Sequence, residues 1–175
     1  METVTPAAST SSVAMRYGLL TGLVSILFMF LTFATGQESN QAMSWAGIII
    51  PLGGIFLAHK AFKQLNAGFM SYGQGLGIGV LVALVSGILG SIFSYVYRTF
   101  VDPDLTNRTM EAARAKMEAG GKMSEAQIDQ AVSMASKFST GPIALAIGIV
   151  GSVVIGLLLS LVIAAITKNS KPEFE

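Results

Sequence analysis

Long apolar stretches without a charged residue alternate with short polar segments along this chain. No Asp, Glu, Lys or Arg lies between Arg16 and Glu38, between Lys63 and Arg98, or between Lys137 and Lys168. An uncharged apolar stretch of about 18 or more residues is typical of a transmembrane helix, because about 20 residues rising ~1.5 Å each cross the hydrocarbon core. The pattern therefore predicts three membrane-spanning helices, at about 17–35, 72–97 and 142–166.

A fourth apolar segment, at about 42–58, is less regular. Its sequence, AMSWAGIIIPLGGIFLA, is close to the lower length limit for a span and contains Pro51, Gly53 and Gly54. Membrane helices accept such residues where neighbouring helices cover the exposed backbone, so we expect a span, with a re-entrant segment as the alternative. Only 12% of the 175 residues are charged, against about 25% in soluble domains. The chain reads as one all-α membrane domain, 1–175, with a polar N-terminal tail at 1–14.

The distribution of Lys and Arg predicts the orientation. The first connection, 36–41, contains neither residue, whereas the next connection contains Lys60 and Lys63. The positive-inside rule then places the second connection and both termini in the cytoplasm. The flanks of the two termini agree with this placement, because Arg16 precedes the first span and Lys168 and Lys171 follow the last span. The segment 98–139 would lie outside, and its six Lys and Arg residues weigh against that placement.

The polar segment at about 102–139 has the features of a helical hairpin outside the membrane. Asp102 and Pro103 predict the start of a first helix, and Gly120–Gly121 its end. Ser124 and Gln127 form a capping-box pattern for a second helix. Apolar residues recur on that helix at helical spacing, and they either pack within the hairpin or bind a partner. The candidate partner surface is Ile128, Val132, Ala135 and Phe138.

Small residues recur every four positions in the third and last apolar stretches. Residues four apart lie on one helix face, and small residues there let membrane helices approach closely. We therefore predict two packing faces, which either face each other within one chain or face a second copy. Leu81, which lies between Gly79 and Ala83 in the sequence, should point away from the packing face and contact lipid. The predicted packing residues are Gly75, Gly79, Ala83, Gly87 and Ser91 in the third span, and Gly148, Ser152, Gly156, Ser160 and Ala164 in the last.

Residues for most catalytic chemistry are missing from this chain. It has no cysteine and one histidine, His59, which we expect at the membrane interface beside Lys60. The glycine-rich stretch 73–79 fits neither a dinucleotide fingerprint nor a P-loop. No Asp, Glu, Lys or Arg lies inside a predicted span, although ion sites and proton relays in membranes rely on such residues. We therefore expect no enzyme, no catalytic residue, no cofactor or metal site, and no nucleic-acid partner.

Four segments of the chain are distinctive: NAGFMSYGQGLGIG (66–79), FSYVYRTFVDPD (93–104), MEAGGKMSEAQIDQAVSM (117–134) and KNSKPEFE (168–175). Together they resemble the bacterial four-span family catalogued as domain of unknown function 4199. The resemblance implies a multi-pass protein of the bacterial cytoplasmic (inner) membrane, and it brings no activity with it.

Two function classes follow from the sequence. One is a structural or accessory subunit that contacts other membrane proteins, or its own copies, through helix faces and the hairpin. The other is a small transporter or channel-like protein for a neutral or facilitated substrate, working as an oligomer, since backbone groups and pore width alone can give selectivity.

Overall fold

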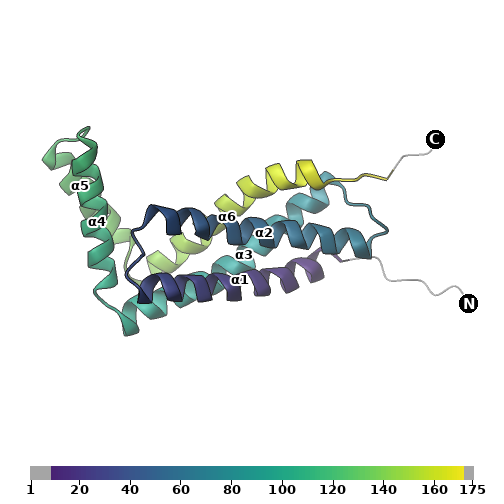
Figure 1. Ribbon diagram of the computed structural model, residues 1–175, viewed down its shortest axis with the longest axis horizontal. Coiled ribbons are helices and arrows are strands. Elements are labelled where there is room, and N and C mark those ends of the chain that lie inside the picture. Colours follow the sequence, from purple (N-terminus) through teal and green to yellow (C-terminus); the bar gives the residue numbers. More distant parts are fainter. Residues whose placement is uncertain (1–8, 172–175) are drawn as a thin grey trace, which may run out of the picture.

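The computed structural model describes residues 9–171, and most of these residues lie in helices (Figure 1). Within this range there is no strand, only an isolated bridge between Met70 and Asn169. The predicted all-α class is confirmed. The helices are α1 (Thr10–Ala34), α2 (Gln41–Leu65), α3 (Tyr72–Val96), α4 (Leu105–Gly120), α5 (Glu125–Phe138) and α6 (Gly141–Thr167), with a π-helical turn, η1 (Tyr97–Val101), directly after α3.

Helices α1, α2, α3 (together with η1) and α6 are each long and apolar enough to cross a membrane. They leave large apolar side chains such as Leu27, Ile49 and Val150 on the outer surface of the bundle. Exposed apolar surface of this extent is typical of contact with lipid or with a protein partner. Helix α2 continues unbroken through Pro51, so this segment is a helix of spanning length and not a re-entrant turn. The four predicted apolar helices are thus confirmed.

Several helix ends differ from the sequence-based prediction. Helix α1 begins at Thr10, seven residues before the predicted span, because the Ser9 hydroxyl caps it by accepting from the Ser12 amide at 3.3 Å. The predicted polar tail, 1–14, therefore includes part of a helix, and residues 1–8 lie outside the described range. Helix α2 extends beyond residue 58 to Leu65, so Lys60 and Lys63 lie on a helix rather than in the connection. Hydropathy shows where the apolar stretch meets charged residues, whereas the capping hydrogen bonds determine where the helix itself starts and ends.

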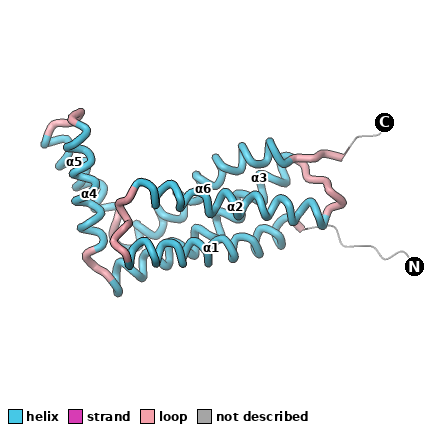
Figure 2. The backbone as a smooth tube through the Cα atoms, viewed as in Figure 1, coloured by secondary structure: helices cyan, strands magenta, loops and turns pink. Residues whose placement is uncertain are grey.

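The four long helices run side by side, and their connections divide between the two ends of the bundle (Figure 2). The start of α1, the α2–α3 connection and the end of α6 lie at one end. The α1–α2 connection and the α4–α5 pair lie at the other end, with α4 and α5 standing across the bundle axis (Figure 1). Helix α3 packs against each of the other three long helices.

The apolar core lies at the end of the bundle that contains the start of α1 and the end of α6. Leu81 is half-buried and packs against this core, so it is not the purely outward-facing residue of the sequence-based expectation. Side chains from α1, α2, α3 and α6 contribute to it. The buried members are Val13, Ala14, Ile55, Ala58, Phe62, Met70, Ile78, Val82 and Ile163.

The helical hairpin forms with one boundary changed. Helix α4 begins at Leu105, two residues later than predicted, because Asp102 follows η1 and binds Arg108 with its side chain. Gly121 ends α4 with φ at +62°, a conformation that glycine adopts without strain. The capping box of Ser124 and Gln127 is present at the start of α5. The described chain thus has a helix, a glycine turn and a second capped helix in the predicted order.

Candidate functional site

The small-residue faces of α3 and α6 lie directly against each other within one chain. The two helices are antiparallel, and each pair of facing residues is displaced from the next by four positions along both helices. All ten predicted packing residues take part, although Gly148 stays exposed near the end of the contact. The five facing pairs are Gly75 with Ala164, Gly79 with Ser160, Ala83 with Gly156, Gly87 with Ser152, and Ser91 with Gly148.

The separation of α3 and α6 leaves no room for a side chain at the central glycines. A Cβ atom added at Gly79 would lie 2.8 Å from the Cβ of Ser160 and 3.1 Å from a methyl carbon of Ile55. A Cβ atom added at Gly87 would lie 2.6 Å from the Cβ of Ser152. Real Cβ contacts essentially never fall below 3.0 Å, so these two positions require glycine at the present helix separation.

Helix α1 approaches α3 in the same way, on another side of α3. A Cβ atom added at Gly18 would lie 2.7 Å from the Cβ of Val85, and one added at Gly22 would lie 3.2 Å from the Cβ of Leu89. The glycine-rich sequence of α3 and its neighbours thus serves close packing within the bundle. These faces pack against each other within one chain and not against a second copy.

His59 joins three helices near the end of the bundle that contains the core. It is fully buried between the helices. Its Nε2 lies 2.8 Å from the carbonyl oxygen of Gly75 on α3, and its Nδ1 lies 2.8 Å from the hydroxyl of Thr167 on α6. A carbonyl oxygen only accepts, so Nε2 carries a proton. The Nζ of Lys63 also donates to the Thr167 carbonyl at 3.1 Å. This polar junction ties α2 to the ends of α3 and α6.

A cavity of about 460 Å³ occupies the other half of the bundle, towards the α1–α2 connection. It extends inward to Pro51 and Ser86, beyond which the apolar core begins. Apolar side chains form much of its wall, and seven hydroxyl-bearing residues interrupt them. These are Ser25 and Thr32 of α1, Ser44 of α2, Ser86, Ser91 and Ser94 of α3, and Ser152 of α6.

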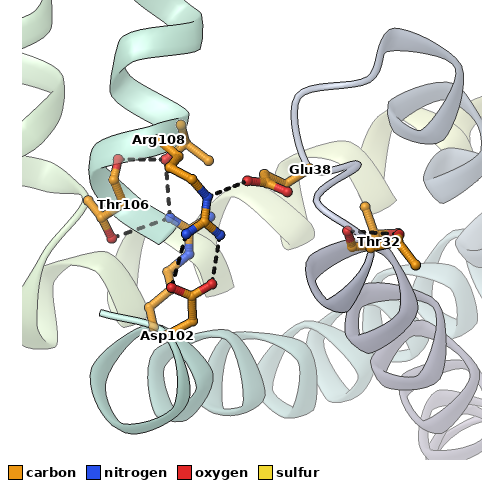
Figure 3. Close-up of polar contacts among 8 residues, drawn as sticks. Thr32, Glu38, Asp102, Thr106 and Arg108 are labelled. Atoms are coloured by element: carbon orange, nitrogen blue, oxygen red, sulfur yellow. Dashed lines mark hydrogen bonds and ion pairs between the residues drawn. The ribbon is translucent and has the colours of Figure 1, made fainter. Parts of the chain in front are cut away.

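Glu38, in the α1–α2 connection, lines this cavity and also reaches the start of α4 (Figure 3). Its Oε1 accepts from Nε of Arg108 at 3.3 Å. Arg108 also donates to both carboxylate oxygens of Asp102, at 3.1 and 2.6 Å. The paired hydrogen bonds with Asp102 raise the pKa of Arg108, and those from Arg108 hold the pKa of Asp102 below its usual value. Bidentate pairs of this kind fix orientation as well as adding energy.

Further contacts attach the α4–α5 pair to the bundle. The guanidinium of Arg98 in η1 lies 5.6 Å from the centre of the Phe33 ring of α1, and it also donates to the hydroxyl of Thr106 on α4 at 3.5 Å. Lys116 of α4 donates to the carbonyl of Ser39 at 2.9 Å. Charged contacts therefore link α4 to the α1–α2 connection at two points, Arg108 and Lys116. Individually exposed ion pairs contribute little, but several in one place fix the direction of a helix.

The predicted partner surface on α5 is divided between the inside and the outside of the hairpin. Ile128 is only 3% exposed and Val132 is half-buried, so neither is free to bind a partner. Ala135 is exposed and Phe138 is 50% exposed. Met134, which the sequence analysis did not select, is 54% exposed. The exposed apolar part of α5 thus lies in its last two turns.

The family of the protein can be identified by sequence comparison. Residues 16–169 match the family described as Protein of unknown function (DUF4199). The chain belongs to this family. The matched region takes in most of α1 and all of α2 to α6. Searches of curated proteins and of solved structures found no match to the chain. The DUF4199 description names no activity, so function has to be inferred from the geometry of the fold.

Sequence reasoning missed Glu38 as a site residue of this DUF4199 protein. Its sequence context offered one signal, because it is the only charged residue between Arg16 and His59. The partners of Glu38 could not be foreseen, since Arg108 lies 70 residues further along the chain. Among residues 9–171, the structure brings no three His, Asp or Glu side chains together in a metal-binding arrangement.

Proposed function

We propose that this protein is a non-enzymatic accessory subunit of the bacterial cytoplasmic membrane, with both termini in the cytoplasm and the α4–α5 hairpin outside. In this proposal the hairpin binds another membrane protein. The observation that carries it is the combination of a hairpin fixed to the bundle by charged contacts and an exposed apolar patch on it. The patch consists of Met134 and Phe138, which are 54% and 50% exposed.

The chemistry of this patch favours a protein surface as the occupant. Methionine is flexible and polarizable, and it adapts to irregular apolar surfaces. The packing faces of α3 and α6 are used within the chain, which argues against a second copy bound through those faces. The patch also lies at the end of α5 that leads into α6, close to the level at which α6 begins. The partner is therefore a membrane protein that presents an apolar surface next to the bilayer.

Site-specific photocrosslinking in native membranes tests this proposal. A photoreactive phenylalanine analogue at Phe138 should crosslink to one protein in a defined stoichiometry, and Met134→Ser should reduce that yield. The same analogue at Lys122, at the far end of the hairpin, is the matched control and should not give the adduct. Adducts only with lipid or only with a second copy would reject the proposal.

The cavity in the bundle favours a second candidate function, a small transporter or channel-like protein for a neutral substrate. It reaches from the α1–α2 connection to the middle of the bundle and stops at the buried core. Transport would therefore require the core half to open. Purified protein in liposomes should then release a trapped neutral solute faster than empty liposomes do, and Gly47→Leu, at the cavity wall, should slow the release.

A further inference from the structure

The cavity between α1, α2, α3 and α6 has the size and lining of a ligand site. Its volume, about 460 Å³, falls in the range of small-molecule pockets, roughly 300–1,000 Å³. Phe28 and Met29 of α1, Ile48 of α2 and Ile155 of α6 provide apolar wall. Polar groups are fewer, and among residues 9–171 the only carboxylate that lines the cavity is that of Glu38. Such a combination suits a molecule with an apolar body and one polar group.

Glu38, which lines this cavity, has one carboxylate oxygen without a partner among the described residues. The side chain is only 7% exposed, and Arg108 occupies its Oε1. Its Oε2 is buried and accepts no hydrogen bond from the described residues. A buried carboxylate oxygen without a donor costs free energy, so a ligand that supplies a donor there gains by removing this cost.

Four of the seven hydroxyl groups around the cavity have their own proton engaged, so they are placed to accept a hydrogen bond from a ligand. Thr32, Ser44, Ser86 and Ser152 each donate their hydroxyl proton to a carbonyl of their own helix, at 2.7 to 3.2 Å. Their oxygen lone pairs remain available to a ligand. Pro51 has no N–H, so the Gly47 carbonyl one turn earlier loses its usual helical donor. Both of these residues line the cavity.

The charges around Glu38 balance one another. Its carboxylate and that of Asp102 are negative, whereas Arg108 and Arg98 are positive, and Arg98 is near enough to interact with Glu38. The cluster therefore has no net charge to attract an ion. A cation would be repelled by the two guanidinium groups, and an anion would be repelled by the free Oε2 of the carboxylate. A neutral group avoids both electrostatic penalties.

We infer that the cavity binds a neutral amphiphile whose polar group carries hydroxyl or amide N–H donors, with one donor bound to Oε2 of Glu38. The apolar part of the ligand packs against α1 and α2. This binding site is independent of the partner surface on α5, since it lies inside the bundle and needs neither a protein partner nor transport.

Two probes that share the octanoyl chain and the amide carbonyl, one with N–H donors and one without, test the inference. Octanamide has two amide N–H donors, and N,N-dimethyloctanamide has none. Binding of each to the full-length protein in nanodiscs is measured by equilibrium dialysis, with empty nanodiscs to correct for partition into lipid. Octanamide should bind the wild type at least about tenfold more tightly, which corresponds to about 1.4 kcal/mol. Octylammonium and octanoate, the charged analogues, should bind more weakly than octanamide.

Variants distinguish the contribution of the Glu38 carboxylate from that of the cavity and from that of the Asp102–Arg108 contact. Glu38→Leu should remove the preference for octanamide, whereas Asp102→Asn should keep it, because Asp102 binds Arg108 but does not line the cavity. Gly47→Leu should fill the cavity and weaken both probes. Gly53→Leu, on the same helix with open space beside it, should weaken neither.

Three results would overturn the inference. The first is equal binding of the two amides to the wild type, and the second is a preference that survives in Glu38→Leu. The third is tighter binding of octylammonium than of octanamide, which would mean that the site prefers a cationic ligand. If Glu38→Leu does not fold, the comparison of Gly47→Leu with Gly53→Leu decides whether the amides bind in the cavity at all. None of these results depends on the photocrosslinking at Phe138.

Discussion

The contact between α3 and α6 allows a sharp test, since two glycines of α3 lie two residues apart in opposite environments. A Cβ atom at Gly79 would meet Ser160 at 2.8 Å, whereas one at Gly77 would meet nothing within 4 Å. Gly79→Leu and Gly77→Leu therefore make the same chemical change in the same helix. Only the first should push helices apart.

The expected difference in stability can be estimated from these contacts. Forcing extra carbons into a packed interface costs about 1–3 kcal/mol. The upper value applies at Gly79, because both Ser160 and Ile55 must move. Replacing glycine by leucine in a helix gains about 0.8 kcal/mol at either position. Gly79→Leu should thus lose about 2 kcal/mol and Gly77→Leu should gain a little. The two variants should differ by about 3 kcal/mol, or roughly 6–12 °C by the scale for soluble domains of this size.

Thermal unfolding in a mild detergent, followed by circular dichroism, measures this difference. A compensating pair of substitutions then tests whether the contact with Ser160 is the cause. Gly79→Ala introduces the clash, and Ser160→Gly removes the opposing Cβ, so the double variant should recover stability lost by Gly79→Ala alone. Neighbouring residues in direct contact typically show coupling of about 0.5–3 kcal/mol. Equal melting of Gly79→Leu and Gly77→Leu, or no recovery in the double variant, would refute the packing explanation.

Three further predictions concern the orientation and the hairpin. In spheroplasts, Ser124→Cys should react with a membrane-impermeant maleimide and Gln64→Cys should not, because the chain has no other cysteine and Lys60 and Lys63 place that end of α2 inside; the reverse pattern would invert the orientation. The folded state lowers the pKa of Asp102, so its pair with Arg108 stabilises the hairpin above the ordinary carboxyl pKa of 3.8 and loses that effect as the pH falls through the lower folded value; hydrogen exchange in the first turn of α4 should accelerate there in the wild type and not in Asp102→Asn. The isolated segment 100–140 should be only partly helical in water, since helices of this length are marginal without packing; a fully helical fragment in buffer would contradict this.

The membrane-type helices could be predicted from the sequence because hydropathy over about 20 residues is a strong local signal. The facing residues of α3 and α6 could be proposed for a similar reason, since a four-residue period marks one helix face. Which surface each face meets depends on tertiary packing, and the sequence left two arrangements open. Leu81 shows the same limit, because a leucine in an apolar helix gives the same sequence signal whether it faces lipid or the core.

Polar residues with distant partners could not be predicted. His59 appeared to be interfacial because it stands beside Lys60 in the sequence, but in the fold it bonds Gly75 and Thr167 on two other helices. Asp102 looked like a helix cap, because an acid before a proline is a common start of a helix. Its side chain instead binds Arg108, and the preceding π-helical turn moves the start of α4 to Leu105. Local patterns describe helices well and contacts between them poorly.

The packing of the bundle divides its length into two parts with different physical consequences. At the end with the core, the contact of Gly75 with Ala164 and the bonds of His59 hold α2, α3 and α6 together. At the other end, α3 and α6 stay in contact through Gly87 and Ser152, while Pro51 and Gly47 of α2 line the cavity. A proline in mid-helix removes one backbone hydrogen bond and so weakens the helix at the point where the cavity begins. The first half of α2 is therefore the part of the bundle that can move most easily without separating α3 from α6. A ligand in the cavity would act on this half-helix, and through Glu38 and Arg108 on the direction of the hairpin.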